Sequence, residues 1–215
     1  SRTPLREKNT SVIYNGIDTS AFIRPRSNSL RQKYGWSEDE IIIGSLGNIR
    51  PAKGYDILLK AAALLEHGSH SYRFVIAGQG KGKLFDELLA LRKELGLEEK
   101  VQFPGFIDDA ADFLANIDIF LSSSISEGLP LSAIQAMVAA LPIVATRCGG
   151  YEGLLTDQEN GVLVKVGDPQ ALADAIEMLA ANPGFQKTLS ENARNHAVST
   201  FDVQMMLDAY EQDYD

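Results

Sequence analysis

The sequence predicts an α/β fold: a Rossmann-like parallel sheet with helices on both faces, in one domain that spans residues 1–215. Two observations support this prediction. Short apolar segments alternate with longer segments in which apolar residues recur at helical spacing, and the distances between them suit right-handed crossovers between parallel strands. No internal repeat or low-complexity segment appears, and no convincing boundary divides the chain.

Each element has its own local signal. Segments rich in Val, Ile, Leu and Phe are predicted as strands: residues 10–14, a strand opening at 41–43, 72–77, 101–103, 117–121, 143–146 and 161–164. Helical spacing or a terminating glycine predicts helices over residues 27–34, 55–66, 84–95, 110–115, 131–141, 169–181, 185–199 and 202–214, with one helical turn over 151–155. The last three helices are expected to pack on the same sheet.

The composition argues against several classes of protein. A net charge of −9 argues against a nucleic-acid partner, because binding to a phosphate backbone requires clustered cations. No run of 18 apolar residues is present, so no transmembrane span is expected. The single cysteine, Cys148, excludes an internal disulfide and fits a reducing compartment; we expect it to be packed rather than nucleophilic. The N-terminus carries no secretory signal and lacks a Met, which predicts a piece of a longer protein.

The segment over residues 122–146 carries the strongest functional signal. An apolar strand leads into a Ser-rich turn with one acid, Glu127, and then into an apolar helix. Pro130 suits the first turn of that helix, since it lacks an N–H that would be unpaired there. The N–H groups of Leu131 and Ser132 are then expected to be free at the positive end of the helix, where phosphate binds. Glu127 beside this site could accept hydrogen bonds from sugar hydroxyls.

A second candidate phosphate site is the loop over residues 47–54, which follows a predicted strand and opens a helix. Its cations Arg50 and Lys53, together with free N–H groups at the helix start, fit phosphate binding. The alternative is a solvated loop with ordinary surface charges. The histidines lie apart on polar stretches and predict no metal site: His67, His70 and His196.

These motifs, in this order, resemble the C-terminal donor-binding domain of retaining glycosyltransferases with the GT-B fold, family four in particular (glycosyl transferases group 1). The donor motif of that family has EGxPL followed by a second glutamate. Gln135 stands in the place of that second acid, and the matching positions are Glu127, Gly128, Pro130 and Leu131. The resemblance covers nearly the whole chain, from its Asn-Gly-Ile-Asp run near the N-terminus to the final helices.

The resemblance implies roles for individual residues. Glu127 would lie by the donor sugar as the catalytic residue, and Gln135 would hold the nucleotide ribose without the charge of a glutamate. Asn48 stands at the position of the family's phosphate-binding arginine, and Arg50 either reaches round to replace it or faces outward. The implied donor- and phosphate-binding set is Gly47, Asn48, Arg50, Lys53, Gly128, Leu129, Pro130, Leu131 and Gln135.

The nucleotide base is implied to bind near two turns. Gly78 lies in a turn that resembles the family's G-x-G turn, although two close glycines more often mark a tight turn without a ligand. Phe106 and Ile107 follow a turn that resembles the family's F-x-G turn. We expect Phe106 in the core and the backbone of Ile107 as the better base contact.

The implied protein is one lobe of a GT-B glycosyltransferase whose N-terminal, acceptor-binding lobe is absent from this chain. The full enzyme would transfer a sugar from a nucleotide diphosphate sugar to an acceptor hydroxyl with retention, without a cofactor or metal, and the isolated lobe would be inactive. Its implied partners are the nucleotide-sugar donor, an unknown glycan or lipid-linked acceptor and its own N-terminal lobe. A cytoplasmic location in polysaccharide biosynthesis follows, with attachment to the inner face of the membrane open only through the missing lobe.

Two alternatives bear on this interpretation. Asn48 and Gln135, at two charged positions of the family, motivate a non-catalytic relative with a decayed nucleotide-sugar site. A dinucleotide-dependent Rossmann oxidoreductase would need G-x-G-x-x-G on its first strand–helix turn and an acid about 20 residues later. The turn at Gly47 lacks that pattern, so this class is not favoured.

Overall fold

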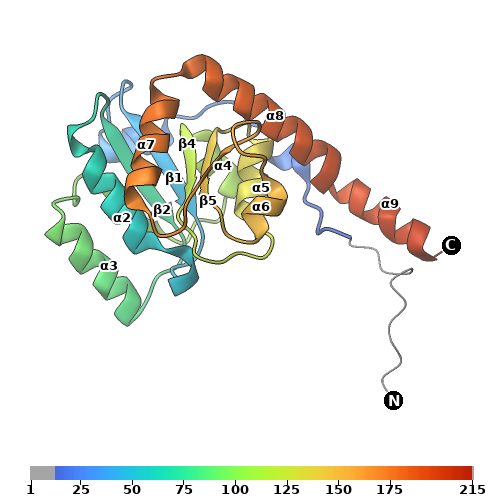
Figure 1. The fold of residues 1–215 in the computed structure, drawn as a ribbon, viewed down its shortest axis with the longest axis horizontal. Helices are drawn as coiled ribbons and strands as arrows, with labels where there is room; N and C mark the ends of the chain where they lie inside the picture. The colour runs from blue at the N-terminus through green and yellow to red at the C-terminus, as the bar shows by residue number, and fades with distance from the viewer. Residues whose placement is uncertain (1–12, 215) are drawn as a thin grey trace.

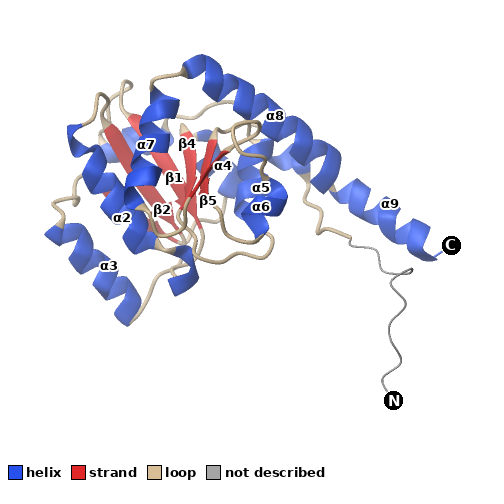
Figure 2. Ribbon diagram, in the orientation of Figure 1, coloured by secondary structure: helices blue, strands red, loops and turns tan. Residues whose placement is uncertain are grey.

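The computed structural model describes residues 13–214 and consists of one fully parallel, six-stranded sheet with helices on both faces (Figures 1 and 2). The strand order is β3-β2-β1-β4-β5-β6, so the sheet grows outward in both directions from the neighbouring strands β1 and β4. This order confirms the predicted Rossmann-like fold.

The strands coincide closely with the apolar segments of the sequence. Their bounds are β1 (Ile41–Leu46), β2 (Tyr72–Ala77), β3 (Val101–Gly105), β4 (Ile119–Ser122), β5 (Ile143–Thr146) and β6 (Val162–Val164). The strand predicted over residues 10–14 lies mostly outside the described residues, and its last two residues, Ile13 and Tyr14, have no regular structure.

Two hydrophobic clusters cover the two faces of the sheet. Alternate strand residues point to opposite faces, so Ile43 and Phe74 belong to one cluster while Ile42 and Val75 belong to the other. The first cluster packs against α2 (Tyr55–Leu64), α3 (Lys83–Glu94) and α7 (Pro169–Ala180). The second packs against α4 (Ala110–Ala115), α5 (Leu131–Val138), α6 (Gly150–Leu154) and α8 (Pro183–Phe201). Both faces are therefore buried, as strands with continuous apolar runs require.

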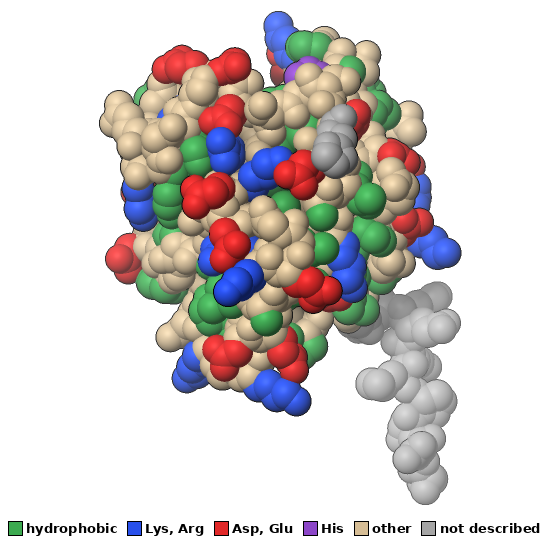
Figure 3. All heavy atoms as spheres, turned by 90° about the vertical axis from the view of Figure 1, so that its left-hand side faces the viewer, with side chains coloured by type: hydrophobic (Ala, Val, Ile, Leu, Met, Phe, Trp, Pro, Cys, Tyr) green, Lys and Arg blue, Asp and Glu red, His purple; other side chains and the backbone are tan. Residues whose placement is uncertain are grey.

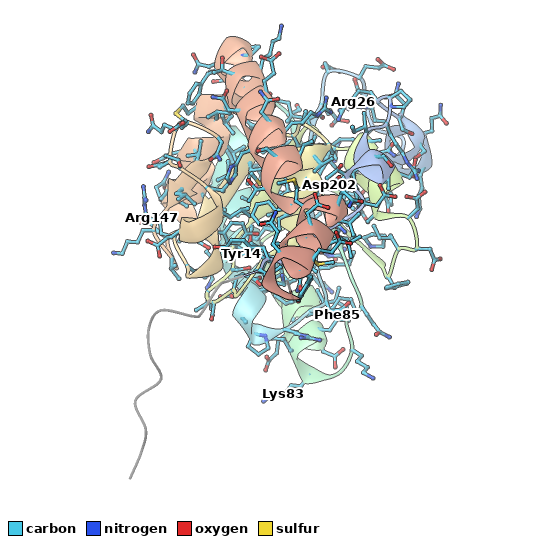
Figure 4. The ribbon with its side chains drawn as sticks, turned by 90° about the vertical axis from the view of Figure 1, so that its right-hand side faces the viewer. Tyr14, Arg26, Lys83, Phe85, Arg147 and Asp202 are labelled. Carbon is cyan, nitrogen blue, oxygen red and sulfur yellow. The ribbon has the colours of Figure 1, made fainter. Side chains whose placement is uncertain are left out.

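The C-terminal helix departs from the prediction. Helix α9 (Val203–Tyr214) contacts α8 and extends away from the sheet instead of packing on it (Figure 1). Its start is joined to the N-terminal segment, because Ile17 pairs with Asp202 and the N–H of Gly16 contacts the sulfur of Met206 at 3.2 Å. Figure 4 shows Tyr14 and Asp202 close to this α8–α9 junction.

Short helical segments lie between the larger elements. Helix α1 (Ser29–Tyr34) and the 3-10 turns η2 (Thr19–Phe22), η3 (Pro51–Lys53) and η4 (Leu65–His67) connect the larger elements.

Acidic and basic side chains are interspersed over the face that α2 and α3 present (Figure 3). Among the helices that the structure describes, none has the length and apolar character needed to cross a membrane.

Candidate functional site

The candidate site is a cleft at the carboxyl edge of the sheet, where the strand order changes direction between β1 and β4. Ligands of open parallel sheets bind at such a point, because the loops after the two strands diverge there. The cleft has a volume of about 380 Å³ and is lined by Leu46, Gly47, Asn48, Arg50, Lys53, Glu127, Leu129, Pro130, Leu131, Ser132 and Gln135. The two loops that carried the sequence motifs thus meet in one site.

A larger cavity, of about 450 Å³, lies at the opposite edge of the sheet, before β4 and β5. The cations along it are already engaged: Arg24 pairs with Asp109, Arg26 pairs with Asp118, and Nε of Arg194 donates to the carbonyl of Val138. Volume alone therefore does not identify a ligand site, and the smaller cleft is the candidate because the two sequence motifs line it.

An ion pair joins the two loops across the cleft. Lys53 Nζ lies 2.7 Å from Glu127 Oε1, and the two side chains are only 21% and 15% exposed. The hydroxyl of Ser124 donates to the same oxygen at 2.8 Å. Both partners use Oε1, and within the described part of the chain no hydrogen bond engages Oε2. One carboxylate oxygen thus remains available as an acceptor.

Several backbone N–H groups near Glu127, at the start of α5, are unpaired in the part of the chain that the structure describes. Those of Gly128, Leu129 and Ser132 make no hydrogen bond to any other described residue. The prediction that the N–H of Leu131 is free is wrong, because this N–H donates to the carbonyl of Leu129 at 3.0 Å. Three donors are left at the start of α5, where the helix dipole favours negative charge.

The corrected geometry follows from the conformation of Pro130. This residue was predicted in the first turn of the helix, but it precedes α5 as the N-cap with φ −79° and ψ 84°. Those angles are close to the central residue of an inverse γ-turn, which bonds the residue after it to the residue before it. The turn takes one N–H from the helix start and leaves that of Ser132 unpaired.

Tight backbone contacts fix the loop after β1. The hydroxyl of Tyr55 donates to the carbonyl of Gly47 at 2.8 Å, and a Cβ on Gly47 would lie 2.8 Å from Cε of Lys53. Gly78 has φ +150°, and a Cβ there would lie 2.1 Å from the carbonyl oxygen of Gly47. Gly78 is therefore explained by close backbone packing, and its contact with a nucleotide base stays a prediction.

Asn48 and Arg50 differ in how far they are engaged. The side-chain oxygen of Asn48 accepts the N–H of Gln79 at 2.9 Å, which ties the loop after β1 to the loop after β2. Arg50 lies on the exposed rim of the cleft, and no hydrogen bond or ion pair joins its side chain to the rest of the described chain. Of the two, Arg50 is the residue that can turn toward an incoming anion.

The loop that carries Glu127 rests on a pair of glycines after β5. The N–H of Gly150 donates to the carbonyl of Glu127 at 2.8 Å, and a Cβ on Gly150 would lie 1.7 Å from the carbonyl oxygen of Gly128. Gly149 has φ +42°, and a Cβ there would lie 2.7 Å from the same carbonyl of Glu127. No role was predicted for these glycines, although their adjacency after a strand was the available signal.

Buried polar side chains pack beneath the cleft, in and just after the end of β4. Ser122 and Ser124 are buried with their hydroxyl oxygens 3.1 Å apart, and Ser123 Oγ donates to the carbonyl of Lys53 at 2.9 Å. Tyr55 and Tyr151 are also buried, and burial raises the pKa of both phenols, so they stay protonated. The first three serines of the run, Ser122, Ser123 and Ser124, are therefore packed, whereas Ser126 is exposed.

The predicted base-binding turn lies outside the lining of the cleft. Phe106 is 69% exposed, so its expected place in the core is wrong. Ile107 is half-buried and packs against the second hydrophobic cluster. An exposed aromatic ring after β3 is available to stack on a planar ligand, and base binding at this turn stays a prediction.

Neither a reactive cysteine nor a metal cluster accompanies the cleft. Cys148 is buried, and burial raises the pKa of its thiol, which agrees with the packed role predicted for it. Among the side chains that the structure describes, no group of three from His, Cys, Asp or Glu is arranged to hold a metal ion.

Known proteins share this fold and these motifs. The family model described as "Glycosyl transferases group 1" matches residues 27–196. The putative glycosyltransferase EpsD of Bacillus subtilis is 34% identical over 202 residues, which cover 91% of this chain and 52% of that protein. The lipopolysaccharide core biosynthesis glycosyltransferase LpsE of Rhizobium meliloti is 32% identical over 182 residues, 85% of this chain and 52% of that protein. The chain thus spans about half the length of these relatives.

Solved structures agree with the sequence relatives. HepE of Anabaena, in complex with UDP and glucose, superposes with a TM-score of 0.88 at 29% identity, over 96% of this chain and 57% of that one. The C-terminal domain of the glycosyl transferase LpcC from Francisella tularensis superposes with a TM-score of 0.74 at 26% identity, over 88% of this chain and 100% of that one. The chain therefore belongs to the glycosyl transferases group 1 family and has the Rossmann-like fold of a GT-B glycosyltransferase lobe.

Proposed function

We propose that this chain is the C-terminal, nucleotide-sugar-binding lobe of a GT-B glycosyltransferase. The complete enzyme transfers a sugar from a nucleotide diphosphate sugar to an acceptor hydroxyl with retention at the anomeric carbon. The observation that carries the proposal is the cleft at the sheet edge, which is lined by Lys53, Glu127 and two residues with unpaired backbone N–H groups, Leu129 and Ser132. A cation with free N–H donors suits a diphosphate, and an acid with one open oxygen suits sugar hydroxyls.

Transfer requires the bond between the anomeric carbon and the diphosphate oxygen to break. Negative charge then grows on the leaving diphosphate, and in this proposal Lys53 and the N–H groups of Leu129 and Ser132 stabilise it, with that of Gly128 beside them. Glu127 orients the sugar through Oε2, while Gln135 in the first turns of α5 meets the ribose. These residues act through charge and hydrogen bonding, so the proposed mechanism uses no metal ion and no cofactor.

The donor class and the partners extend the same proposal. HepE is described with UDP and glucose, which supports a nucleotide-sugar donor here. Gly78, Phe106 and Ile107 are proposed for the base. The match over the whole of the LpcC C-terminal domain supports a separate N-terminal lobe, and we propose that this lobe binds a glycan or lipid-linked acceptor. We further propose that the isolated lobe is inactive and that the enzyme is cytoplasmic, with any membrane attachment through the other lobe.

A decayed, non-catalytic site is the second candidate. Asn48 favours it, because its side-chain oxygen is occupied by the N–H of Gln79 and it brings no charge to the position of the family's arginine. The two candidates differ in whether a nucleoside diphosphate binds.

Calorimetric titration tests the proposal directly. Uridine, guanosine and adenosine diphosphates are titrated against this lobe and against the full-length protein, with the matching nucleosides as controls. We expect one diphosphate to bind more tightly than its nucleoside, because the cleft supplies phosphate contacts. Absence of binding by all three diphosphates to the full-length protein would establish the decayed site.

A further inference from the structure

The two side chains assigned to different parts of the donor are bonded to each other in the unliganded cleft. Lys53, assigned to the diphosphate, lies 2.7 Å from Glu127, assigned to the sugar. A bound diphosphate draws the Lys53 ammonium toward itself, since charge-assisted hydrogen bonds to phosphate are among the strongest that a lysine makes. Glu127 would then lose one of its two partners at the moment when the sugar must be oriented.

We propose that Ser124 is a positioning residue that keeps Glu127 oriented once Lys53 has turned to the diphosphate. This inference rests on the function proposed above. The Ser124 hydroxyl donates to Glu127 Oε1 at 2.8 Å, on the same oxygen that Lys53 contacts. That shared oxygen leaves Oε2 without a hydrogen bond to any other described residue, so in this proposal the sugar and the anchor use different atoms of one carboxylate.

The Ser124 side chain is more buried and more firmly held than the Lys53 side chain. Ser124 is 1% exposed, whereas the Lys53 side chain is 21% exposed on a flexible four-carbon stem. The Ser124 hydroxyl also lies 3.1 Å from that of Ser122, and its carbonyl accepts the hydroxyl of Thr146 on β5. Ser124 is thus held to β5 just after the end of β4, while Lys53 is the last residue of the 3-10 turn η3.

The serine run contains a matched control. Ser126 is exposed and belongs to the same turn, and its hydroxyl makes no hydrogen bond to other described residues. Removing this hydroxyl changes the composition of the turn without touching Glu127. Ser124→Ala removes the anchor but keeps the hydrogen bond from the Thr146 hydroxyl to the backbone carbonyl of residue 124, so the loop remains attached to β5.

The experiment uses the full-length enzyme with Ser124→Ala, Ser126→Ala, Glu127→Gln and the Ser124→Ala/Glu127→Gln double variant. The ligands are uridine, guanosine and adenosine diphosphates, and their glucose, N-acetylglucosamine and mannose conjugates. Calorimetry gives the dissociation constants, and acceptor-independent hydrolysis of the best-bound conjugate gives kcat and KM. Melting temperatures report whether each variant is folded.

We expect Ser124→Ala to bind the bare diphosphate as the wild type does and to lose about tenfold in kcat/KM, as for one charge-assisted hydrogen bond. Ser126→Ala should match the wild type. In the Glu127→Gln background, Ser124→Ala should have little further effect on kcat/KM, because the group it positions is already altered. A merely structural serine would lower both backgrounds equally.

The outcomes separate this inference from the proposed function. If the wild type binds none of the diphosphates, the proposed function fails and the inference fails with it. If the wild type binds a diphosphate but gains nothing from any attached sugar, Glu127 is not a sugar contact and the role of Ser124 is overturned. The role is also overturned if Ser124→Ala turns over donor as the wild type does, or if its loss persists in full in the Glu127→Gln background.

Discussion

Two carboxylates at opposite ends of β4 show how differently the same chemical group is used. Asp118 precedes the strand and accepts from Arg26, from Arg31 at 2.9 Å and from the N–H of Ile42 at 2.8 Å. Both of its oxygens are engaged. Glu127 follows the strand and has both partners on one oxygen. A saturated carboxylate holds elements together, whereas an acid with an open oxygen in a cleft is available to a ligand.

Replacement of Glu127 should have the largest effect on sugar transfer. We expect Glu127→Gln in the full-length enzyme to lower transfer about a hundredfold, because a misplaced sugar is no longer aligned for reaction. The melting temperature should change little, since glutamine can still accept from Ser124. Binding of the bare diphosphate should become tighter, because Lys53 is released and a repelling charge is removed. Steady-state kinetics, calorimetry and thermal melting measure the three quantities.

Near-normal turnover of Glu127→Gln at an unchanged melting temperature would remove Glu127 from the site.

The reciprocal change at Asp118 should act on stability. We expect Asp118→Asn to lower the free energy of unfolding by about 2 kcal/mol, because the half-buried Arg31 keeps its charge while its carboxylate partner is lost. Diphosphate binding by the folded protein should be unchanged, since Asp118 lies at the far edge of the sheet. Urea denaturation measures the first quantity and calorimetry the second. A loss of binding in folded Asp118→Asn would contradict the separation of the two edges.

Lys53 is the cation that pairs with Glu127, and its proposed contact with the diphosphate can be tested separately. Lys53→Ala should weaken binding of the nucleoside diphosphate about tenfold, the worth of one charge-assisted contact, with a smaller effect on the free nucleoside. Lys83→Ala is the matched control, because Lys83 begins α3 and is 91% exposed. Calorimetry compares the two ligands. Equal losses for diphosphate and nucleoside would show that Lys53 does not contact the diphosphate.

The smallest expected effect concerns Asp202 at the α8–α9 junction, labelled in Figure 4. The hydrogen bond from Thr19 is the main cause that holds the pKa of this carboxyl below its ordinary value. Its folded pKa is therefore lower than its unfolded pKa, so the stabilisation is present above about pH 4 and is lost as the pH falls through the folded value.

Thr19→Val removes the donor and tests this dependence. The variant should be slightly less stable than the wild type at pH 6, and the difference should shrink below about pH 4. Urea denaturation at both pH values measures it. A difference that does not change with pH would assign the effect of Thr19 to packing.

The secondary structure was predictable because its signals are local. The strand expected over residues 72–77 is β2, and the final helices begin and end within two residues of their expected bounds. The helix expected over 131–141 is shorter and ends at Val138, because Ala140 adopts a left-handed φ of 53°. Glycine usually occupies such a position at a helix end, so the alanine at this position did not indicate that the helix ends early.

Periodicity and motif spacing are properties of neighbouring residues, so the sequence predicted the alternation of strands and helices, the two loops that line the candidate cleft, and Glu127 and Lys53 within those loops. Tertiary structure decided that Lys53 pairs with Glu127, that Asn48 holds Gln79 and that Gly150 supports the Glu127 loop. These contacts join loops after different strands, and they arise only when a parallel sheet brings the carboxyl ends of those strands to one edge.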